Sequence, residues 1–374
     1  PRGRPMNRRD LLLTLSTAAA ALAAVPHLAS AAETSGRGGP GPRNLITDVP
    51  GLTVGQSEDS KVRTGVTVIL PEGRATCAAD VRGGGPGTRE TDALNSWNLV
   101  HSVDAVVLSG GSVYGLASAD GVVSWLGAHN RGFAMLPAPG VPVSPVVPAA
   151  ILYDLANHGN KNWGMKPPYR DLGFEAIQKT GLDFKLGTAG AGYGAEAGGI
   201  KGGLGSASYV SQDGMTVGAV VAVNSLGSAV VPGTKNFWAG ALEIGNEFGG
   251  LGASNARIAT EDWGLIKPDP GPRKNTTIAC IATDVELDID QMKRVTMMAQ
   301  DGLARAIRPI HSPFDGDVVF GLSTAKRKMT GPMAEFTVAR LGAIAADTLA
   351  RAVARGIYEA TLPPGAEGKT WHTL

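Results

Sequence analysis

The sequence has few cysteines, aromatic residues and charges, and these shortages exclude several classes of protein. Its 374 residues include 2 cysteines, and aromatic and charged residues make up 5% and 18% of the chain. Such a composition does not fit a disulfide scaffold, a disordered acidic chain or a coiled coil. The net charge is only +1, which is far from the strongly basic balance of a nucleic-acid-binding protein. We therefore expect no nucleic-acid partner.

Several common catalytic and cofactor-binding motifs are also missing. The chain has no H-E-x-x-H motif and no paired cysteine spacing, and its 6 histidines are scattered. Residues 190–194 (GAGYG) lack the strand–glycine–helix order of a dinucleotide site, and residues 108–112 lack the G-x-S-x-G elbow of a serine hydrolase. The sequence therefore predicts no bound metal and no cofactor.

Glycine, in contrast, is abundant. There are 52 glycines, about twice the usual share of ~7%. Because glycine permits close backbone contact, this abundance indicates a compact, enzyme-like globule.

The first residues are typical of an export signal. Arg8 and Arg9 precede an apolar run over residues 11–25, and the small residues 29–31 follow. The run is shorter than the about 20 apolar residues that a membrane span needs. We predict a twin-arginine signal peptide over residues 1–31 and a flexible leader over residues 32–43, so the mature protein would be periplasmic or secreted and free of the membrane.

Alternating short strands and helices indicate one layered α/β or α+β domain over residues 44–374. Strands are predicted over 66–70, 105–109, 216–223, 277–282 and 318–322. Helices are predicted over 91–100, 116–126 and 333–360, and from a cap at Asp288 or Asp290 to Pro309. Cys77 and Cys280 each lie in a possible strand, where they could form a disulfide or stay as two small buried residues.

Asn275 and Thr276 are a candidate for chemistry. They lie between a segment with three prolines, residues 267–274, and the predicted strand 277–282. Cleavage between them would give an N-terminal threonine, whose α-amine has a pKa near ~7.7–8.0 and can activate the hydroxyl. A plain strand start is the alternative interpretation.

Segments spread over most of the chain resemble the self-processing aminopeptidase/amidase family of D-aminopeptidases, β-peptidyl aminopeptidases and the nylon-oligomer endo-hydrolase. The matching segments are 44–55 (NLITDVPGLTVG), 81–94 (VRGGGPGTRETDAL), 108–120 (LSGGSVYGLASAD), 145–154 (PVVPAAILYD), 198–205 (GGIKGGLG), 217–227 (VGAVVAVNSLG), 275–284 (NTTIACIATD) and 301–317 (DGLARAIRPIHSPFDGD). The resemblance implies an N-terminal-nucleophile-type αββα sandwich of the α+β class, with a D-aminopeptidase/ornithine-acetyltransferase-like fold.

The same resemblance implies roles for individual residues. Thr276 would be the nucleophile. Cleavage after Asn275 would free its amine and divide the polypeptide into an α chain 32–275 and a β chain 276–374. Lys201 would lie near the nucleophile and hold its amine neutral, and Asn224 would donate its amide to the developing oxyanion.

Further matches concern the surroundings of the nucleophile. Asp315 and Asp317 match an acidic pair that orients the lysine and the new amine. Two carboxylates at one site would repel each other, so we expect Lys201 to lie between them. Tyr153 matches a tyrosine whose hydroxyl faces the nucleophile, and Tyr114 is a further candidate for lining the substrate pocket.

The resemblance is strongest to the threonine-nucleophile branch that contains the nylon-oligomer hydrolase, because other members have a serine nucleophile and a Ser-Gly-Glu element. The implied substrates are short peptides, β- or D-amino-acid amides, or linear nylon oligomers. The implied assembly is a homo-oligomer, a tetramer or octamer of αβ units. Two other interpretations are an acyltransferase of the ornithine-acetyltransferase type and a non-catalytic exported binding protein on the same scaffold.

Overall fold

The computed structural model describes residues 38–267, 275–330 and 333–374. The predicted signal peptide therefore lies outside the described residues. Part of the predicted flexible leader is described, and it is attached to the domain: Gly39 exchanges backbone hydrogen bonds of 3.0 and 2.7 Å with Val210. Among the described residues, no helix is long and apolar enough to span a membrane.

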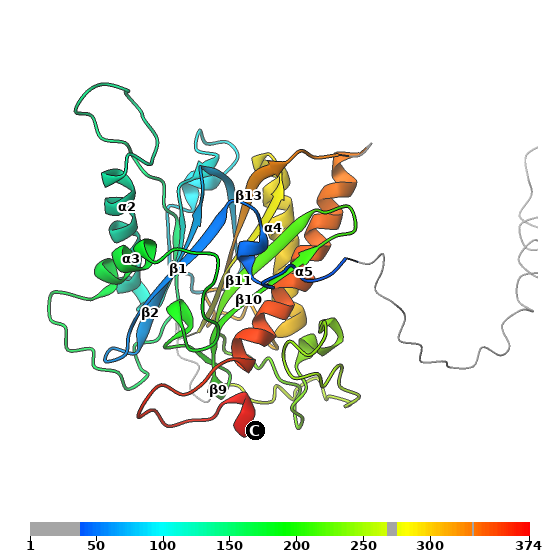
Figure 1. Cartoon of the computed structure of the whole chain (residues 1–374). Helices are drawn as coiled ribbons and strands as arrows, with labels where there is room; N and C mark the ends of the chain where they lie inside the picture. Colours follow the sequence, from blue (N-terminus) through cyan, green and yellow to red (C-terminus); the bar gives the residue numbers. More distant parts are fainter. Residues whose placement is uncertain (1–37, 268–274, 331–332) are drawn as a thin grey trace, which may run out of the picture. The chain divides into compact units, whose positions relative to one another are not determined.

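Two sheets form the centre of the fold (Figure 1). The first has the order β1 (Leu52–Asp59), β2 (Thr64–Pro71), β6 (Val106–Ser109), β7 (Ala149–Ile151) and β4 (Thr88–Arg89). The second has the order β10 (Gly203–Val210), β11 (Thr216–Asn224), β12 (Thr276–Val285), β13 (Val318–Arg327), β3 (Ala75–Val81) and β5 (Ser102–Val103). A short hairpin of β8 (Glu196–Ala197) and β9 (Ile200–Lys201) lies beside them.

Helices cover the outer face of each sheet. Helices α2 (Ser118–Ala128) and α3 (Tyr169–Gln178) pack on the first sheet through residues such as Val122, Leu172 and Val68. Helices α4 (Ile289–Ala306) and α5 (Ala334–Tyr358) pack on the second. Figure 1 shows both sheets between these two helix layers. The fold is therefore the expected αββα sandwich.

The strand pleat explains how one strand serves two cores. In β12, Ala279 and Ile281 face the layer of α4 and α5, whereas Ile278, Cys280 and Ala282 face the other sheet. Such a strand is buried on both faces, which is why its sequence is a continuous apolar run rather than an alternating one.

Glycines allow α5 to approach the second sheet closely. A Cβ on Gly205 would lie 1.8 Å from the carbonyl oxygen of Ala352, and one on Gly203 would lie 2.3 Å from that of Gly356. Both distances are far below van der Waals contact, so side chains at these positions would push α5 away from β10.

Most predicted elements are confirmed, including the strands at 66–70, 105–109, 216–223, 277–282 and 318–322. The cap of α4 is Asp288: its carboxylate accepts from the Gln291 backbone N–H at 2.8 Å, and the Gln291 side chain accepts from the Asp288 N–H at 3.1 Å. Helix α5 is confirmed within two residues at each end, and α2 starts two residues late.

The predicted helix at 91–100 is wrong. Only Asp92–Leu94 forms a turn of 3₁₀ helix, and Trp97, expected on a buried face, is 81% exposed. The side chains of Asn95 and Asn98 both donate to the Asp92 carbonyl, at 3.0 and 2.6 Å. They compete with the backbone donors that would continue a helix, which explains the early stop.

The two cysteines are free and buried. Cys77 lies in β3 and Cys280 in β12, and β13 separates these strands. Two strand spacings amount to about 9.6 Å, which exceeds the Cα separation that a disulfide tolerates. The structure therefore favours two small buried residues over a disulfide.

Candidate active site

Thr276 and Asn224 lie directly opposite each other. Thr276 is the first residue of β12 and Asn224 the last of β11, and the antiparallel register pairs them. Both have the same parity as the residues that face the other sheet, so their side chains lie on that inner face. Their exposed fractions are 2% and 1%. The candidate nucleophile and oxyanion donor are thus neighbours in a site largely shielded from water.

The carbonyl of Asn275 is the centre of a close arrangement. The Thr276 Oγ1 hydroxyl contacts the Asn275 carbonyl oxygen, and the Gly316 backbone N–H donates to the same oxygen at 3.0 Å. An N–H donor on this oxygen polarises the carbonyl and stabilises negative charge there. The Asn275 side-chain amide is buried without a hydrogen-bond partner among the described residues.

Asp317 is a fully buried hydrogen-bond acceptor at the start of β12. Its Oδ1 accepts from the Thr277 N–H at 2.7 Å, and its Oδ2 accepts from the His311 backbone N–H at 3.0 Å and contacts His311 Nδ1 at 2.9 Å. These contacts tie the start of β12 to the loop that precedes β13.

Asp315 is held in a different way. Its carboxylate accepts from the Leu226 N–H at 3.0 Å and from the Ser312 hydroxyl. Burial, and next the negative charge of Asp317, raise the pKa of Asp315. This direction is the one that repulsion within the acidic pair would produce.

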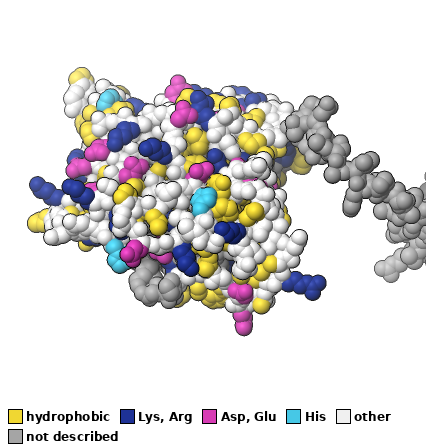
Figure 2. All heavy atoms as spheres, turned by 60° about the horizontal axis from the view of Figure 1, so that its bottom comes forward, with side chains coloured by type: hydrophobic (Ala, Val, Ile, Leu, Met, Phe, Trp, Pro, Cys, Tyr) yellow, Lys and Arg dark blue, Asp and Glu magenta, His cyan; other side chains and the backbone are white. Residues whose placement is uncertain are grey.

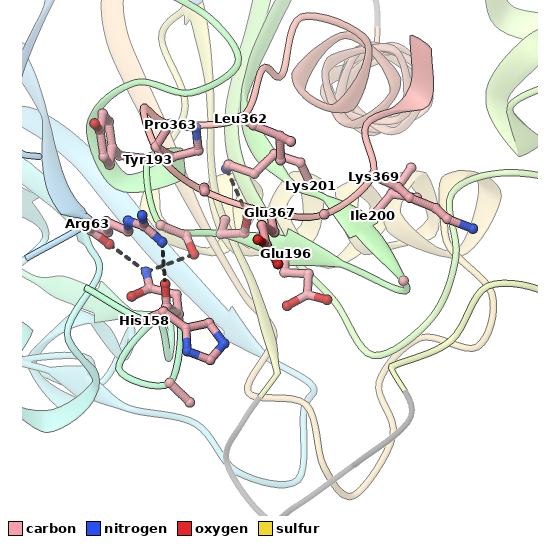
Figure 3. Close-up of a pocket in the computed structure, with 17 residues that line it drawn as sticks. Arg63, His158, Tyr193, Glu196, Ile200, Lys201, Leu362, Pro363, Glu367 and Lys369 are labelled. Atoms are coloured by element: carbon pink, nitrogen blue, oxygen red, sulfur yellow. Dashed lines mark hydrogen bonds between the residues drawn. The ribbon is translucent and has the colours of Figure 1, made fainter. Parts of the chain in front are cut away.

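Lys201 is buried but is not paired with these aspartates. Its Nζ donates to the backbone carbonyls of Gly192, Ala195 and Gly202, at 3.1, 2.9 and 2.7 Å. Figure 3 shows the Lys201 side chain in the lining of a pocket. Burial lowers the pKa of Lys201 to about 7, against the charges of Asp154 and Glu196, which raise it. We expected Lys201 to lie between Asp315 and Asp317. Its amine is instead bound by three backbone carbonyl oxygens.

Another lysine, which sequence analysis did not single out, contacts Asn224. Lys267 donates from Nζ to the backbone oxygen and to Oδ1 of Asn224, at 3.1 and 3.2 Å. Burial lowers the pKa of Lys267 to about 8, while the charges of Glu196 and Asp315 raise it. Its only signal in the sequence is its place at the start of the proline-rich segment, and the rest of that segment lies outside the described residues.

The Asn224 amide has fixed neighbours. Its Oδ1 accepts from the Glu196 N–H at 3.0 Å and from Lys267, and its Nδ2 donates to the Tyr153 carbonyl oxygen at 3.1 Å. Tyr153 follows β7 and is half-buried, so its backbone belongs to the site. The proposed role of its hydroxyl stays a prediction.

Tyr114 lies elsewhere. It is exposed, and its ring packs edge-on against Trp163, with ring centroids 5.5 Å apart. Trp163 in turn packs on Tyr169 of α3, in the outer helix layer. Among the described residues, its ring contact is with Trp163 rather than with another candidate residue, and its role as a pocket residue stays a prediction.

A cavity of about 270 Å³ opens next to the site (Figure 3). Its lining includes the β8–β9 hairpin with Glu196 and Lys201, and the C-terminal segment with Glu367 and Lys369. Glu196 connects this lining to the site, because its N–H donates to Oδ1 of Asn224, the residue opposite Thr276.

Two further observations concern the surface charge and the metal-binding side chains. Basic and acidic side chains are interspersed on the face drawn in Figure 2. Within residues 38–267, 275–330 and 333–374, no group of three or more His, Cys, Asp or Glu side chains is arranged to hold a metal ion.

Comparisons with known proteins identify the family of this chain. The model of Peptidase family S58 matches residues 44–371. An uncharacterised aminopeptidase of Mycobacterium tuberculosis is 43% identical over 335 residues, which cover 85% of this chain and 94% of that protein. The 6-aminohexanoate-oligomer endohydrolase of Paenarthrobacter ureafaciens is 29% identical over 293 residues. The match covers 75% of this chain and 75% of that protein.

A solved structure shows the same fold. The L-aminopeptidase D-Ala-esterase/amidase of Ochrobactrum anthropi, described as a variant of the Ntn hydrolase fold, superposes with a TM-score of 0.62 at 23% identity. The match covers 87% of this chain and 89% of that one. Together these matches show that the chain belongs to Peptidase family S58 and is a hydrolase of peptide or amide bonds.

Proposed function

We propose that the protein is a self-cleaving amide hydrolase whose nucleophile is the N-terminal threonine created by cleavage between Asn275 and Thr276. The observation that carries this proposal is the contact of the Thr276 hydroxyl with the carbonyl of Asn275, whose oxygen also accepts the Gly316 N–H at 3.0 Å. A nucleophile beside a polarised carbonyl is the arrangement that an N→O acyl shift requires.

Maturation would use this arrangement once. Thr276 Oγ1 attacks the Asn275 carbonyl carbon, the C–N bond breaks, and the hydroxyl proton passes to the departing nitrogen. An ester then joins Asn275 to Oγ1, and Thr276 has a free amine. Water hydrolyses the ester and leaves a carboxylate on Asn275 and a free hydroxyl on Thr276. The products are the chains 32–275 and 276–374.

Turnover would repeat the chemistry on a substrate. The α-amine of Thr276 accepts the Oγ1 proton as Oγ1 attacks the substrate carbonyl, and passes that proton to the departing amine. Water then hydrolyses the acyl ester. Asn224 is the candidate donor to the tetrahedral oxyanion, a contribution worth about 2.7–4 kcal/mol in comparable sites. Burial lowers the pKa of Lys201 to about 7, so its amine can exchange a proton close to neutral pH.

The substrate class follows from the relatives and the cavity. A cavity of about 270 Å³ suits a short amide rather than a folded protein. We therefore propose short peptides, β- or D-amino-acid amides, or linear ω-amino-acid oligomers as substrates, with the enzyme exported by its N-terminal residues 1–31 and assembled as a homo-oligomer of αβ units.

The test compares two neighbouring threonines. Thr276→Ala removes the nucleophile, so the purified chain should stay uncut by intact mass and should not release product from amino-acid p-nitroanilides. Thr277→Val is the matched control, because the Thr277 hydroxyl is buried without a partner among the described residues. This variant should still cleave. A Thr276→Ala chain that splits at the same bond would refute the proposal, and product formed only with an added amine acceptor would point to an acyltransferase.

A further inference from the structure

Lys267 has an unusual position for a lysine next to a segment rich in proline. Its backbone N–H donates to the Leu226 carbonyl at 3.2 Å, and its Nζ donates to the backbone oxygen and to Oδ1 of Asn224 at 3.1 and 3.2 Å. Backbone and side chain therefore bind the same short stretch, residues 224–226. The Leu226 N–H in turn donates to Asp315 at 3.0 Å.

These contacts determine how the Asn224 amide is oriented. Oδ1 has two lone pairs, and they accept from the Glu196 N–H and from Lys267 Nζ. The Nδ2 group must then point the other way, and it donates to the Tyr153 carbonyl. If Lys267 lost its donor, the amide would lose one of the contacts that distinguish its oxygen end from its nitrogen end.

The charge of Lys267 matters as well as its hydrogen bonds. The negative charges of Glu196 and Asp315 raise the pKa of Lys267 against the effect of its burial. The backbone also links Lys267 to Asp315, because Leu226 accepts from the Lys267 N–H and donates its own N–H to the Asp315 carboxylate. The negative charge of Asp317 raises the pKa of Asp315, and the positive charge of Lys267 lowers it. In charged form, Lys267 thus favours the ionised state of Asp315.

We infer that Lys267 is a positioning residue of the self-cleaving site, which orients the Asn224 amide opposite Thr276 and places a positive charge on the stretch 224–226 that also binds Asp315. This inference rests on the proposed function. Because Lys267 lies on the N-terminal side of the cleaved bond and is held through its own backbone by Leu226, it keeps this place in the mature αβ enzyme.

The variants separate charge, hydrogen bonding and packing. Lys267→Met keeps the apolar stem but removes the donors and the charge, and Lys267→Arg keeps both in a different shape. Lys166→Met is the matched control, since Lys166 is exposed and lies outside the site. Appearance of the 276–374 fragment is followed by mass spectrometry during cell-free synthesis, and kcat and KM are then measured on mature enzyme from pH 6 to pH 10.

Loss of hydrogen bonds from a charged donor predicts a 10- to 100-fold slower self-cleavage for Lys267→Met, with kcat reduced and KM nearly unchanged. Lys267→Arg should recover most of the rate. The wild-type cleavage rate should fall as the pH rises through about 8, where Lys267 loses its charge, and this fall should move to higher pH in Lys267→Arg.

Two results would overturn the inference. One is a Lys267→Met protein that cleaves and turns over as the wild type does. The other is a slow Lys267→Met protein that Lys267→Arg does not rescue and whose pH profile is unchanged, which would indicate a packing role. In either case, wild-type cleavage before Thr276 would leave the proposed function standing, whereas an uncut, active wild type would remove both.

Discussion

Gly316 provides a sharp test of the site, because its missing side chain leaves room for the nucleophile. A Cβ on Gly316 would lie 2.9 Å from Thr276 Oγ1 and 2.6 Å from the Gly85 carbonyl oxygen. Gly85 cannot easily move, since its own N–H is bound to the Asp315 carbonyl at 2.7 Å. The backbone of Gly316 lies outside the left-handed region, so Gly316→Ala would act through steric overlap and not through backbone strain.

The size of the effect follows from these distances. Carbon needs about 3.5 Å from a non-bonded atom, so Thr276 Oγ1 must shift by roughly 0.5 Å or more. A misplacement of about 1 Å costs roughly 100-fold in rate, which predicts a self-cleavage at least about tenfold slower for Gly316→Ala. Overpacking of this kind should also lower the free energy of unfolding by about 1–3 kcal/mol.

The assay measures the uncut fraction against time by intact mass and follows thermal unfolding by circular dichroism. Gly127→Ala is the control, because a Cβ there meets no atom within 4 Å and α2 continues through it. That variant should cleave normally and gain about 0.5–1 kcal/mol of stability. A folded Gly316→Ala protein that cleaves at the wild-type rate would refute the arrangement of Gly316 and Thr276.

Three other predictions concern buried groups. Asp317→Asn replaces one of the two accepting oxygens by an NH2 donor, which cannot accept the contacts made there. We expect a loss of about 2–4 kcal/mol in unfolding free energy and impaired cleavage. Denaturant titration and intact mass measure these two effects. Burial lowers the pKa of Lys201 to about 7, so between pH 7 and 10 the unfolded chain binds a proton that the folded chain lacks. The free energy of unfolding should therefore rise with pH by up to about 1.4 kcal/mol per unit, and less steeply in Lys201→Met, by denaturant titrations across that range. Burial raises the pKa of the Cys77 and Cys280 thiols, so neither should react with iodoacetamide in the native state, and dithiothreitol should leave the melting temperature unchanged.

The fold was predictable where local pattern and tertiary burial agree. Strand β12 is a continuous apolar run, and α4 combines a capping aspartate with one apolar face, so both could be found from sequence. The prediction failed at residues 91–100, where the apolar spacing is helical but asparagine side chains bind the backbone of Asp92 instead.

The site was predictable only in part, for a physical reason. The family resemblance points to Thr276 and Asn224, and the β11–β12 register accounts for their proximity. The Lys267 contact joins residues 43 apart in sequence through a side chain, and no local pattern encodes it. Likewise, the Gly316 donor is a backbone group, so its residue type says nothing about its partner.

The central claim is that a buried hydroxyl and a newly formed amine on one residue act together. The most direct measurement is the N-terminal sequence of every chain in a fully active preparation, with activity measured on the same sample. The account predicts a fragment that begins at Thr276 in an amount equal to the larger chain. Full activity from protein with an intact bond between Asn275 and Thr276 would contradict it.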